Sequence, residues 1–521
     1  MPRNEADSLA QTRAAVQDGA AGTPDSPERR AFMQLAAAAL VGGLALEARA
    51  EDVSVAGRVF DANAVAELQR QVRGAVVARG TPLYEVWRQS MVWNQRKFRR
   101  FPDLIVQADS EDDVVAAVRF AHQQGVHVIA RGGGHSWSGC FLRDGGVLLD
   151  LSRLQSIQID AGSREARVQP GVIGRILNAR LGEVGLAFPT AHCGMVPVSG
   201  FLMGGGLGLN SVAWGGMSVF NIKAVDVVTA EGERLHANAE QNADFYWAAR
   251  GAGPGLFCVV TRFYLNCYPL PQAIRTDTYF LAFNDLVPLA AAMDELGPNL
   301  DPRLELLTVS VPTPPDLLAR CKTAPCQQVA VLSASAFADS DRDAKGMLAP
   351  LRQHPLLRRA LAKDLHRHTP FEVLYQDNEG PFPQRRARAD NIFTDRVREA
   401  TEVLSRHMLA APSSGNAPVI LWRGEAQFPD AAYSARGRFY FAGYAQWDRP
   451  EDDFTNEAWL KNLFDEMQPF ASGHYINEFD RETRAAQTHD CFAPTHWKRL
   501  QELRDKHDPH RVFPGFLGVQ A

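Results

Sequence analysis

The sequence predicts an α+β protein with two structured parts. As far as about residue 268, segments with helical apolar spacing alternate with short apolar runs typical of strands. Beyond Leu270 the runs become longer and are separated by helices rich in Arg and Leu, which is typical of an antiparallel sheet with one face covered by helices. A chain of 521 residues with 45% hydrophobic content is long enough for both parts to contain an extensive core.

The composition excludes several classes of partner. A formal net charge of -5 and a pI near 6.3 create no field that would collect nucleic acid or an anionic membrane. His366 and His368 are expected on a helix surface without Cys or carboxylate at metal-ligand spacing, so no metal site is predicted. A small-molecule substrate is the expected partner.

The N-terminal segment resembles an export signal. Arg29 and Arg30 precede an apolar run at residues 35–46, which ends in the small-residue pattern Ala48-Arg49-Ala50 of a cleavage site. The run is too short to cross a bilayer comfortably, so no stable membrane anchor is expected, although an uncleaved anchor is the alternative. The paired arginines resemble a signal for the twin-arginine (Tat) export machinery and predict a periplasmic or secreted protein. In an oxidising compartment, Cys321 and Cys326 are close enough in sequence to close a small loop.

The first structured part begins with alternating elements. We expect a helix over residues 62–77 after Asp61, a short strand over 104–107, and a second helix that runs to about Gln124. Ser110 with Asp113 provides the N-terminal cap of this second helix, and Gly125 is positioned to end it. Apolar runs at 126–130 and 147–151 predict two further strands.

A glycine-rich turn, ARGGGHSWSG at residues 130–139, lies between those two strands. Three glycines weaken a helix or a strand, but they let the backbone bring N–H groups against a phosphate or a flat ring. A tight surface turn is the alternative for the glycines alone. The candidate binding residues of this turn are Arg131, Gly132, Gly133, Gly134, His135 and Ser136.

A second glycine cluster follows at residues 191–208. No Lys-Ser or Lys-Thr follows its glycines and no G-x-G-x-x-G occurs, which excludes a nucleotide P-loop and a Rossmann fingerprint. Its candidate residues are Gly200, Gly204, Gly205, Gly206 and Gly208.

The R-x-G-G-H-S pattern at residues 131–136 resembles the signature of the berberine-bridge-enzyme-like branch of the vanillyl-alcohol-oxidase flavoproteins. The resemblance extends over about residues 94–513 and is loose between 271 and 409. It implies a PCMH-type FAD-binding domain at 51–268 after a signal region at 1–50. It further implies a substrate domain at 269–480, with an antiparallel sheet covered by helices, and a C-terminal segment at 481–521 that returns to the FAD domain.

The same resemblance implies a covalent cofactor. His135 would be joined to the 8α-methyl of FAD, and Cys193 would bond the flavin C6 as a second attachment. Pro197 and Ser199 depart from the family, which usually has glycine at both positions. A core cysteine without a flavin bond is the alternative for Cys193.

Two further roles follow from the resemblance. Val196 stands where the family places the side chain that gates O2 to the flavin, and a packing valine is the alternative. A third segment, residues 245–261, resembles the stretch that lines the pyrophosphate and ring, with Gly251, Gly253 and Val259 as candidate contacts. Here Leu256 and Cys258 replace the usual Asn and Gly.

The candidate catalytic residues are Tyr475, Asn477 and Glu478, where much of the family has Y-x-N-Y. On a strand, Tyr475 and Asn477 would share one face and Glu478 would lie on the other. A glutamate needs only an upward pKa shift to act near neutrality, whereas a tyrosine must be lowered from about 10. Glu478 is therefore the expected base and Tyr475 a substrate-positioning hydroxyl. The alternative is that Glu478 is exposed or pairs with Arg481.

These observations predict a secreted FAD-dependent oxidase that takes a hydride from an alcohol, carbohydrate or secondary-metabolite substrate and passes the electrons to O2. A dehydrogenase with another acceptor is the enzymatic alternative. A secreted flavin-binding protein without turnover is the alternative of another class.

Overall fold

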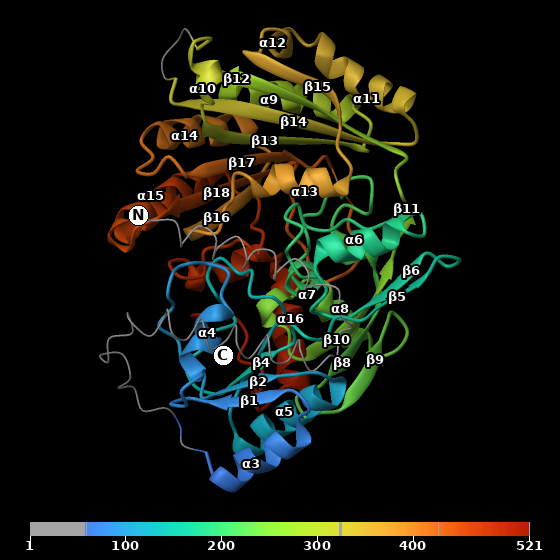
Figure 1. Ribbon diagram of the computed structural model, residues 1–521, viewed down its shortest axis with the longest axis vertical. Helices are drawn as coiled ribbons and strands as arrows, with labels where there is room; N and C mark the ends of the chain where they lie inside the picture. The colour runs from blue at the N-terminus through green and yellow to red at the C-terminus, as the bar shows by residue number, and fades with distance from the viewer. Residues whose placement is uncertain (1–57, 59, 322–325, 426, 520–521) are drawn as a thin grey trace, which may run out of the picture. The chain divides into compact units, whose positions relative to one another are not determined.

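In the computed structural model (Figure 1), the described strands form four sheets, and helices pack around these sheets. This arrangement confirms the predicted α+β class. The structure describes residues 58, 60–321, 326–425 and 427–519, and these belong to one compact unit. The predicted signal region at 1–50 lies outside the described residues. In the part of the chain that is described, no helix is long and apolar enough to span a membrane. The domain boundaries at residues 268 and 480 stay predictions.

A four-stranded sheet forms the first layer, with strand order β1-β2-β4-β3. β2, β4 and β3 are parallel and β1 pairs antiparallel at the edge: β1 (Ala75–Ala78), β2 (Leu104–Gln107), β4 (Val147–Asp150) and β3 (Val128–Arg131). Helices α3 (Ala62–Gln71) and α5 (Glu111–Gln124) share its apolar core. The predicted caps of α5 are confirmed, because Ser110 accepts from Asp113 N–H and Gly125 is left-handed at φ 60°.

The predicted helix at 62–77 was too long. α3 ends at Gln71, and Val76 and Val77 belong to β1, where they pair with Val106 and Ile105. The Asp113 carboxylate accepts the backbone N–H groups of Arg73 and Gly74, which draws the chain out of the helix. The β-branched pair then fits a pleated strand better than a helix.

A five-stranded antiparallel sheet, in the order β5-β6-β10-β8-β9, follows: β5 (Ile157–Asp160), β6 (Glu165–Val168), β10 (Val259–Asn266), β8 (Ile222–Val228) and β9 (Arg234–Ala237). A two-stranded ribbon joins β7 (Leu186–Ala187) and β11 (Tyr268–Pro269). The helices in and around these sheets are α4 (Tyr84–Ser90), α6 (Gly174–Gly182), α7 (Val198–Met203), α8 (Ala243–Ala249) and α16 (Pro494–His507).

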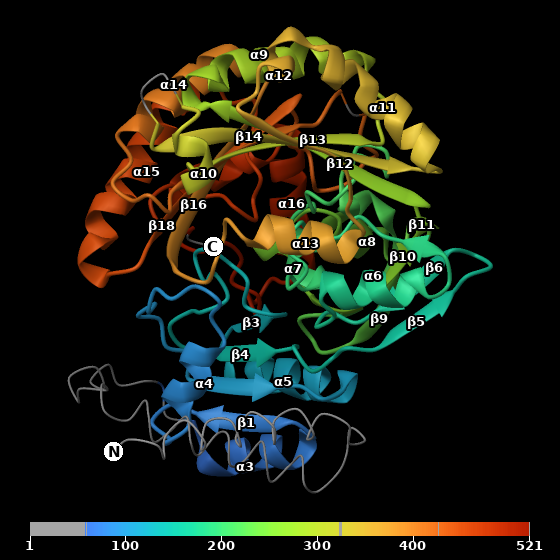
Figure 2. The same ribbon diagram turned by 45° about the horizontal axis from the view of Figure 1, so that its top comes forward.

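The second part of the chain forms a seven-stranded antiparallel sheet in the order β15-β12-β14-β13-β17-β18-β16. Its strands are β15 (Ala362–His368), β12 (Ala273–Ala282), β14 (Gln328–Ala338), β13 (Leu304–Pro312), β17 (Ala417–Trp422), β18 (Phe439–Trp447) and β16 (Arg386–Thr394). Figure 2 shows helices arched over its outer face: α9 (Leu286–Leu296), α11 (Asp341–Gln353), α12 (Pro355–Arg358), α14 (Val397–Leu409) and α15 (Asp453–Met467). α10 (Pro315–Leu318) and α13 (Phe371–Glu379) complete this part. The predicted helix-covered antiparallel sheet is confirmed.

The two faces of this sheet contribute to different cores. Along β18, Phe439 and Phe441 pack with the covering helices, whereas Tyr440, Ala442 and Tyr444 join the core shared with the N-terminal part. This follows from the two-residue side-chain period of a strand. The inner face of the sheet is therefore available to build a site together with the N-terminal part.

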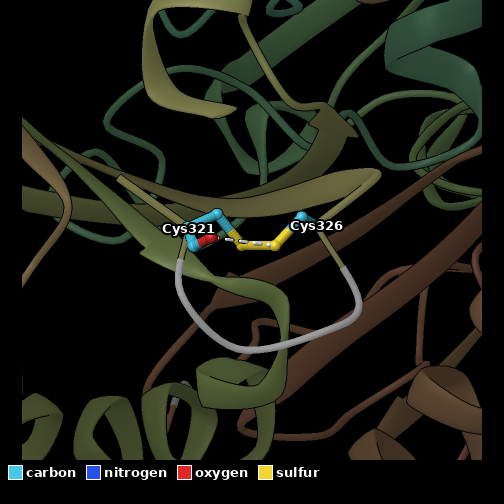
Figure 3. The surroundings of a disulfide bond; sticks show 2 residues. All are labelled: Cys321 and Cys326. Atoms are coloured by element: carbon cyan, nitrogen blue, oxygen red, sulfur yellow. Dashed lines mark hydrogen bonds between the residues drawn. A yellow bond between two sulfur atoms is a disulfide. The ribbon is translucent and has the colours of Figure 1, made fainter. Parts of the chain in front are cut away.

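Two local predictions have opposite outcomes. His366 and His368 lie on strand β15 and not on a helix, and His366 Nε2 is 2.8 Å from Asp341 Oδ1. Within the described residues no group of His, Cys, Asp and Glu could hold a metal ion. Cys321 and Cys326 do close a small loop, because they form a disulfide (Figure 3).

Candidate active site

A cavity of about 410 Å³ lies where the glycine-rich segments meet the inner face of the seven-stranded sheet. This volume is in the usual range of cofactor and ligand sites, about 300–1,000 Å³. The loop after β3 enters from the carboxyl ends of parallel strands, which is where ligands bind in open sheets of this kind. Segments more than 300 residues apart in the chain thus line one cavity.

Most of the predicted site residues line this cavity. They are Arg131, Gly132, Gly133, Gly134, His135, Ser136, Cys193, Val196, Gly200, Gly253, Val259, Tyr475, Asn477 and Glu478. The predicted binding and catalytic segments are therefore brought together, although the role of each residue stays a prediction.

Five predicted glycines lie behind the cavity wall and do not line it: Gly204, Gly205, Gly206, Gly208 and Gly251. A Cβ on Gly204 would approach Asn477 Oδ1 to 2.1 Å, and a Cβ on Gly251 would approach the backbone N of Tyr433 to the same distance. Gly251 also has φ +128°, which side-chain-bearing residues rarely adopt. Close packing of the wall explains these glycines without any contact to a ligand.

Pro197 and Ser199, the two departures from the family pattern, pack against the first glycine turn. A Cβ on Gly133 would lie 2.1 Å from Pro197 Cγ, and a Cβ on Gly132 would lie 2.1 Å from Ser199 Oγ. The larger side chains of the second cluster thus occupy the space left by the glycines of the first.

His135 and Cys193 lie next to each other in the wall of the cavity. His135 Nε2 lies 3.8 Å from Cys193 Sγ, and the His135 ring stacks on Trp93 with centroids 4.6 Å apart. Burial lowers the pKa of His135 to about 4, so the imidazole is neutral near pH 7. A neutral imidazole keeps a lone pair on one ring nitrogen, which is the form that can act as a nucleophile.

Glu379 lies beside the Cys193 thiol. It stands at the end of α13, which packs near α6 (Figure 1), and Cys193 Sγ donates to its Oε1 over 3.5 Å. Gly194 N–H donates to the same oxygen at 2.9 Å, and Arg175 pairs with the other at 3.0 Å. Burial, with the negative charge of Glu379, raises the pKa of Cys193 to about 11. The carboxylate is thus placed to accept the thiol proton.

Two cations line the cavity, the buried Arg481 and the partly buried Arg143. Neither Arg143 nor Arg481 forms an ion pair with a carboxylate in the described chain. Among the described side chains, Nε and Nη1 of Arg481 and the hydroxyl of Ser199 find no hydrogen-bond partner. Burial lowers the pKa of Arg143 to about 10. Because unpaired buried charges are costly, these groups fit a polyanionic ligand such as the diphosphate of FAD.

The segment around Tyr475 is not a strand, so the arrangement of faces considered for that case does not apply. The segment makes one bridge, between Gly473 and Phe393, and then turns, with Glu478 N–H donating to Tyr475 C=O at 3.1 Å. Because the backbone turns, Tyr475 and Glu478 both line the cavity in place of pointing to opposite faces. Asn477 Nδ2 donates to the Tyr475 hydroxyl at 2.9 Å, and Leu207 N–H donates to it at 3.3 Å.

Glu478 is held by two tyrosines from β18. Tyr440 and Tyr444 each donate a hydroxyl to Glu478 Oε2 at 2.5 Å. Burial raises the pKa of Glu478, while the hydrogen bonds from the two tyrosines work in the opposite direction. Burial also raises the pKa of Tyr475, further from neutrality. The predicted alternative, an exposed Glu478 or a pair with Arg481, is wrong, since Arg481 donates to Ile476 C=O.

His192 and Glu305 form a second polar pair in the cavity that sequence reasoning did not identify. Glu305 Oε1 lies 3.0 Å from His192 Nε2, and although burial opposes the charged ring, this carboxylate raises the pKa of His192. Tyr440, Tyr444, Arg143 and Glu379 were missed as well. Only the two-residue alternation along residues 438–447 could have indicated the tyrosines, because the other partners are distant in sequence.

Comparison with known proteins matches residues 102–238 to the FAD binding domain family. The FAD-linked oxidoreductase janO of Penicillium janthinellum is 26% identical over 443 residues, 83% of this chain and 95% of its own. The crystal structure of 6-hydroxy-D-nicotine oxidase from Arthrobacter nicotinovorans superposes with a TM-score of 0.72 at 22% identity, over 85% of this chain and 96% of that one. Berberine bridge enzyme from Eschscholzia californica gives a TM-score of 0.72 at 18% identity, over 86% and 97% of the two chains.

Proposed function

We propose, from the premise that this chain is an FAD-linked oxidoreductase with the fold of berberine bridge enzyme, that it is an oxidase of a small organic donor. FAD, when bound, supplies the acceptor for the electron pair of a C–H bond. The observation that carries the proposal is a buried carboxylate, Glu478, in the same cavity as His135 and Cys193. A donor such as an alcohol must lose a proton as well as a hydride, and a base inside the cavity meets that need.

The residues that would hold FAD fall into two groups. His135 and Cys193 are the proposed covalent attachment points, and their 3.8 Å separation suits attachment along one edge of a ring system. Arg143, Arg481 and the glycine turn at residues 131–136 would bind the diphosphate. Glu379 would accept the Cys193 proton, because only the thiolate is an effective nucleophile.

Glu478 is the proposed base and Tyr475 the positioning hydroxyl. The raised pKa of Glu478 brings it toward neutrality, where a base is most effective. The Tyr475 oxygen already accepts from Asn477 and Leu207, which leaves its own O–H free to orient a substrate atom. Asn477 thereby fixes the hydroxyl.

O2 is the proposed final acceptor, and Val196 is the proposed gate. Its backbone N–H donates to Cys193 C=O at 3.3 Å, and its side chain lines the cavity. We expect Val196→Leu to slow reoxidation by O2 while the substrate still reduces the flavin normally, because the longer side chain narrows the approach beside Cys193. Stopped-flow mixing of the reduced protein with aerated buffer measures the effect, and Val196→Ala is the control that widens the approach. Equal reoxidation rates in all three proteins would show that Val196 does not control the access of O2 to the flavin.

Export through the Tat machinery to the periplasm or the medium belongs to the same proposal. Its supports are the Arg29-Arg30 pair with the following apolar run, and the Cys321–Cys326 disulfide, which suits an oxidising compartment.

A substrate panel tests the proposed function. Under anaerobic conditions a true donor bleaches the flavin absorbance, and readmission of air restores it. Bleaching without recovery in air would assign a dehydrogenase that uses another acceptor. A flavin that no donor bleaches would favour the non-catalytic flavin-binding alternative.

A further inference from the structure

Four aromatic side chains lie beside Glu478 at the end of the cavity formed by the seven-stranded sheet. We call them the aromatic wall: Trp137, Phe382, Tyr440 and Tyr444. We infer that the donor is an amine that binds as an ammonium cation, with its charge against Glu478 and the faces of the aromatic wall. This inference rests on the proposed function and names its substrate class.

Three rings of the aromatic wall are linked by contacts through Tyr444. The rings of Trp137 and Tyr444 lie 5.0 Å apart, and those of Phe382 and Tyr444 lie 4.9 Å apart in an edge-to-face arrangement. Trp93 extends it with a ring 5.2 Å from Trp137. Ring faces carry partial negative charge, and a group of them with a carboxylate is a recurrent binding site for ammonium ions.

The cavity is lined by charges of both signs. Arg143 and Arg481, which lack a carboxylate partner in the described chain, are the cations proposed to bind the diphosphate. At the sheet end lie two carboxylates, Glu478 and Glu305, with His192 as a partner for Glu305. Within the described residues Glu478 forms no ion pair with Lys or Arg; its carboxylate accepts from Tyr440 and Tyr444, and the His192 ring acts on it through its charge.

The neighbouring surface suits an apolar body attached to the cation. Leu307 and Val309 from β13 and Val419 and Leu421 from β17 line the same cavity. Two hydroxyls of the sheet that line the cavity are engaged with one another, since Thr276 Oγ1 and Ser335 Oγ are 2.9 Å apart. An amine with a hydrophobic frame satisfies this surface better than a polyhydroxylated sugar, which needs many free hydrogen-bonding groups.

Oxidation of an ammonium substrate to an iminium ion conserves atoms and charge. The C–H bond next to nitrogen breaks and its electron pair passes with the hydrogen to FAD. The N–H proton passes to the Glu478 carboxylate, and a C=N double bond forms in the product. The positive charge of the substrate is retained in an iminium ion.

Binding to the holoprotein tests the inference without turnover. The probe is benzyltrimethylammonium, which has no N–H to lose, and its control is 2,2-dimethylpropylbenzene, which has the same shape without the charge. Perturbation of the flavin absorbance, or quenching of tryptophan fluorescence, gives the two affinities. We expect the cation to bind about tenfold more tightly. Equal affinities would overturn the inference.

Variants of the cavity residues identify the groups that cause the preference for the cation. Glu478→Gln and Phe382→Leu should each remove most of the preference for the cation while the affinity for the uncharged control changes little. Asp377→Asn is the matched control, because Asp377 lines the cavity but pairs with Arg367 at 2.6 Å. A preference that survives in both Glu478→Gln and Phe382→Leu would overturn the inference. If alcohols bleach the flavin while the cation shows no preference, the amine class falls and the proposed oxidase stands.

Discussion

Glu478→Gln should retain a full flavin spectrum yet be reduced by its donor about 10²–10⁴-fold more slowly, the usual cost of losing a general base. Glutamine can still accept hydrogen bonds from Tyr440 and Tyr444, so the wall of the cavity should keep its shape. It cannot take a proton. Anaerobic stopped-flow reduction measures the effect apart from the reaction with O2.

The pH dependence distinguishes the two candidate bases. Because the pKa of Glu478 is raised, its carboxylate form is gained as the pH rises through that pKa, and the wild-type reduction rate should rise with it. The reduction rate of the Glu478→Gln variant should not show this rise with pH and should recover little at high pH. If Tyr475 were the base, the reduction rate would rise only above pH 10, because burial raises the pKa of Tyr475 from that ordinary value.

Tyr475→Phe is the matched variant. It removes one hydroxyl and keeps the ring in its buried site. We expect a weaker effect than that of Glu478→Gln, expressed mainly as a higher substrate concentration for half-maximal reduction. Collapse of reduction in Tyr475→Phe, with near-normal reduction in Glu478→Gln, would transfer the role of base to Tyr475.

The attachment of FAD gives the second large effect. We expect His135→Ala and Cys193→Ala each to keep FAD through the remaining bond, and the double variant to release all of it on acid precipitation. Flavin absorbance in the supernatant and in the pellet, with peptide mass spectrometry, measures the three outcomes. A colourless pellet from the wild-type protein would contradict the proposal.

Glu379 sharpens this test. Glu379→Gln removes the proton acceptor beside the Cys193 thiol, and burial keeps this thiol mostly protonated at neutral pH. We expect this variant to carry the His135 bond and to form the Cys193 bond slowly, with rescue as the pH is raised. Glu372→Gln is the control, because Glu372 also pairs with Arg175 but does not contact the thiol.

Local patterns predicted much of the fold. The cap at Ser110, the end of α5 at Gly125 and the strand that begins at Val147 were set by residues close in sequence, and the structure has all three. The boundary at Gln71 and the turn at Tyr475 were not predictable in this way. The first depends on Asp113, forty residues away from Arg73, and the second on Asn391, whose side chain donates to the Tyr475 carbonyl.

Only those residues of the candidate site that stand together in one short segment of the chain could be predicted from the sequence. Both attachment residues and both base candidates stand in recognisable motifs, but their surroundings come from other elements. His192 meets Glu305 over 113 positions, and Cys193 meets Glu379 over 186. No periodicity or short motif specifies contacts at such separations, because they arise when the sheet packs against the glycine-rich segments.

The alternation along β17 and β18 has a consequence for how this scaffold could acquire new specificities. Val419, Leu421, Tyr440 and Tyr444 point to the cavity, while their neighbours Ile420, Phe439 and Phe441 belong to the core beneath the helices. Substitutions at every second position can therefore reshape the pocket and leave the interior packing of the helical layer untouched. A single-residue insertion or deletion in either strand would exchange the two sets and damage both. Diversity in a directed library should accordingly be confined to the inward-facing positions, with the strand lengths held constant.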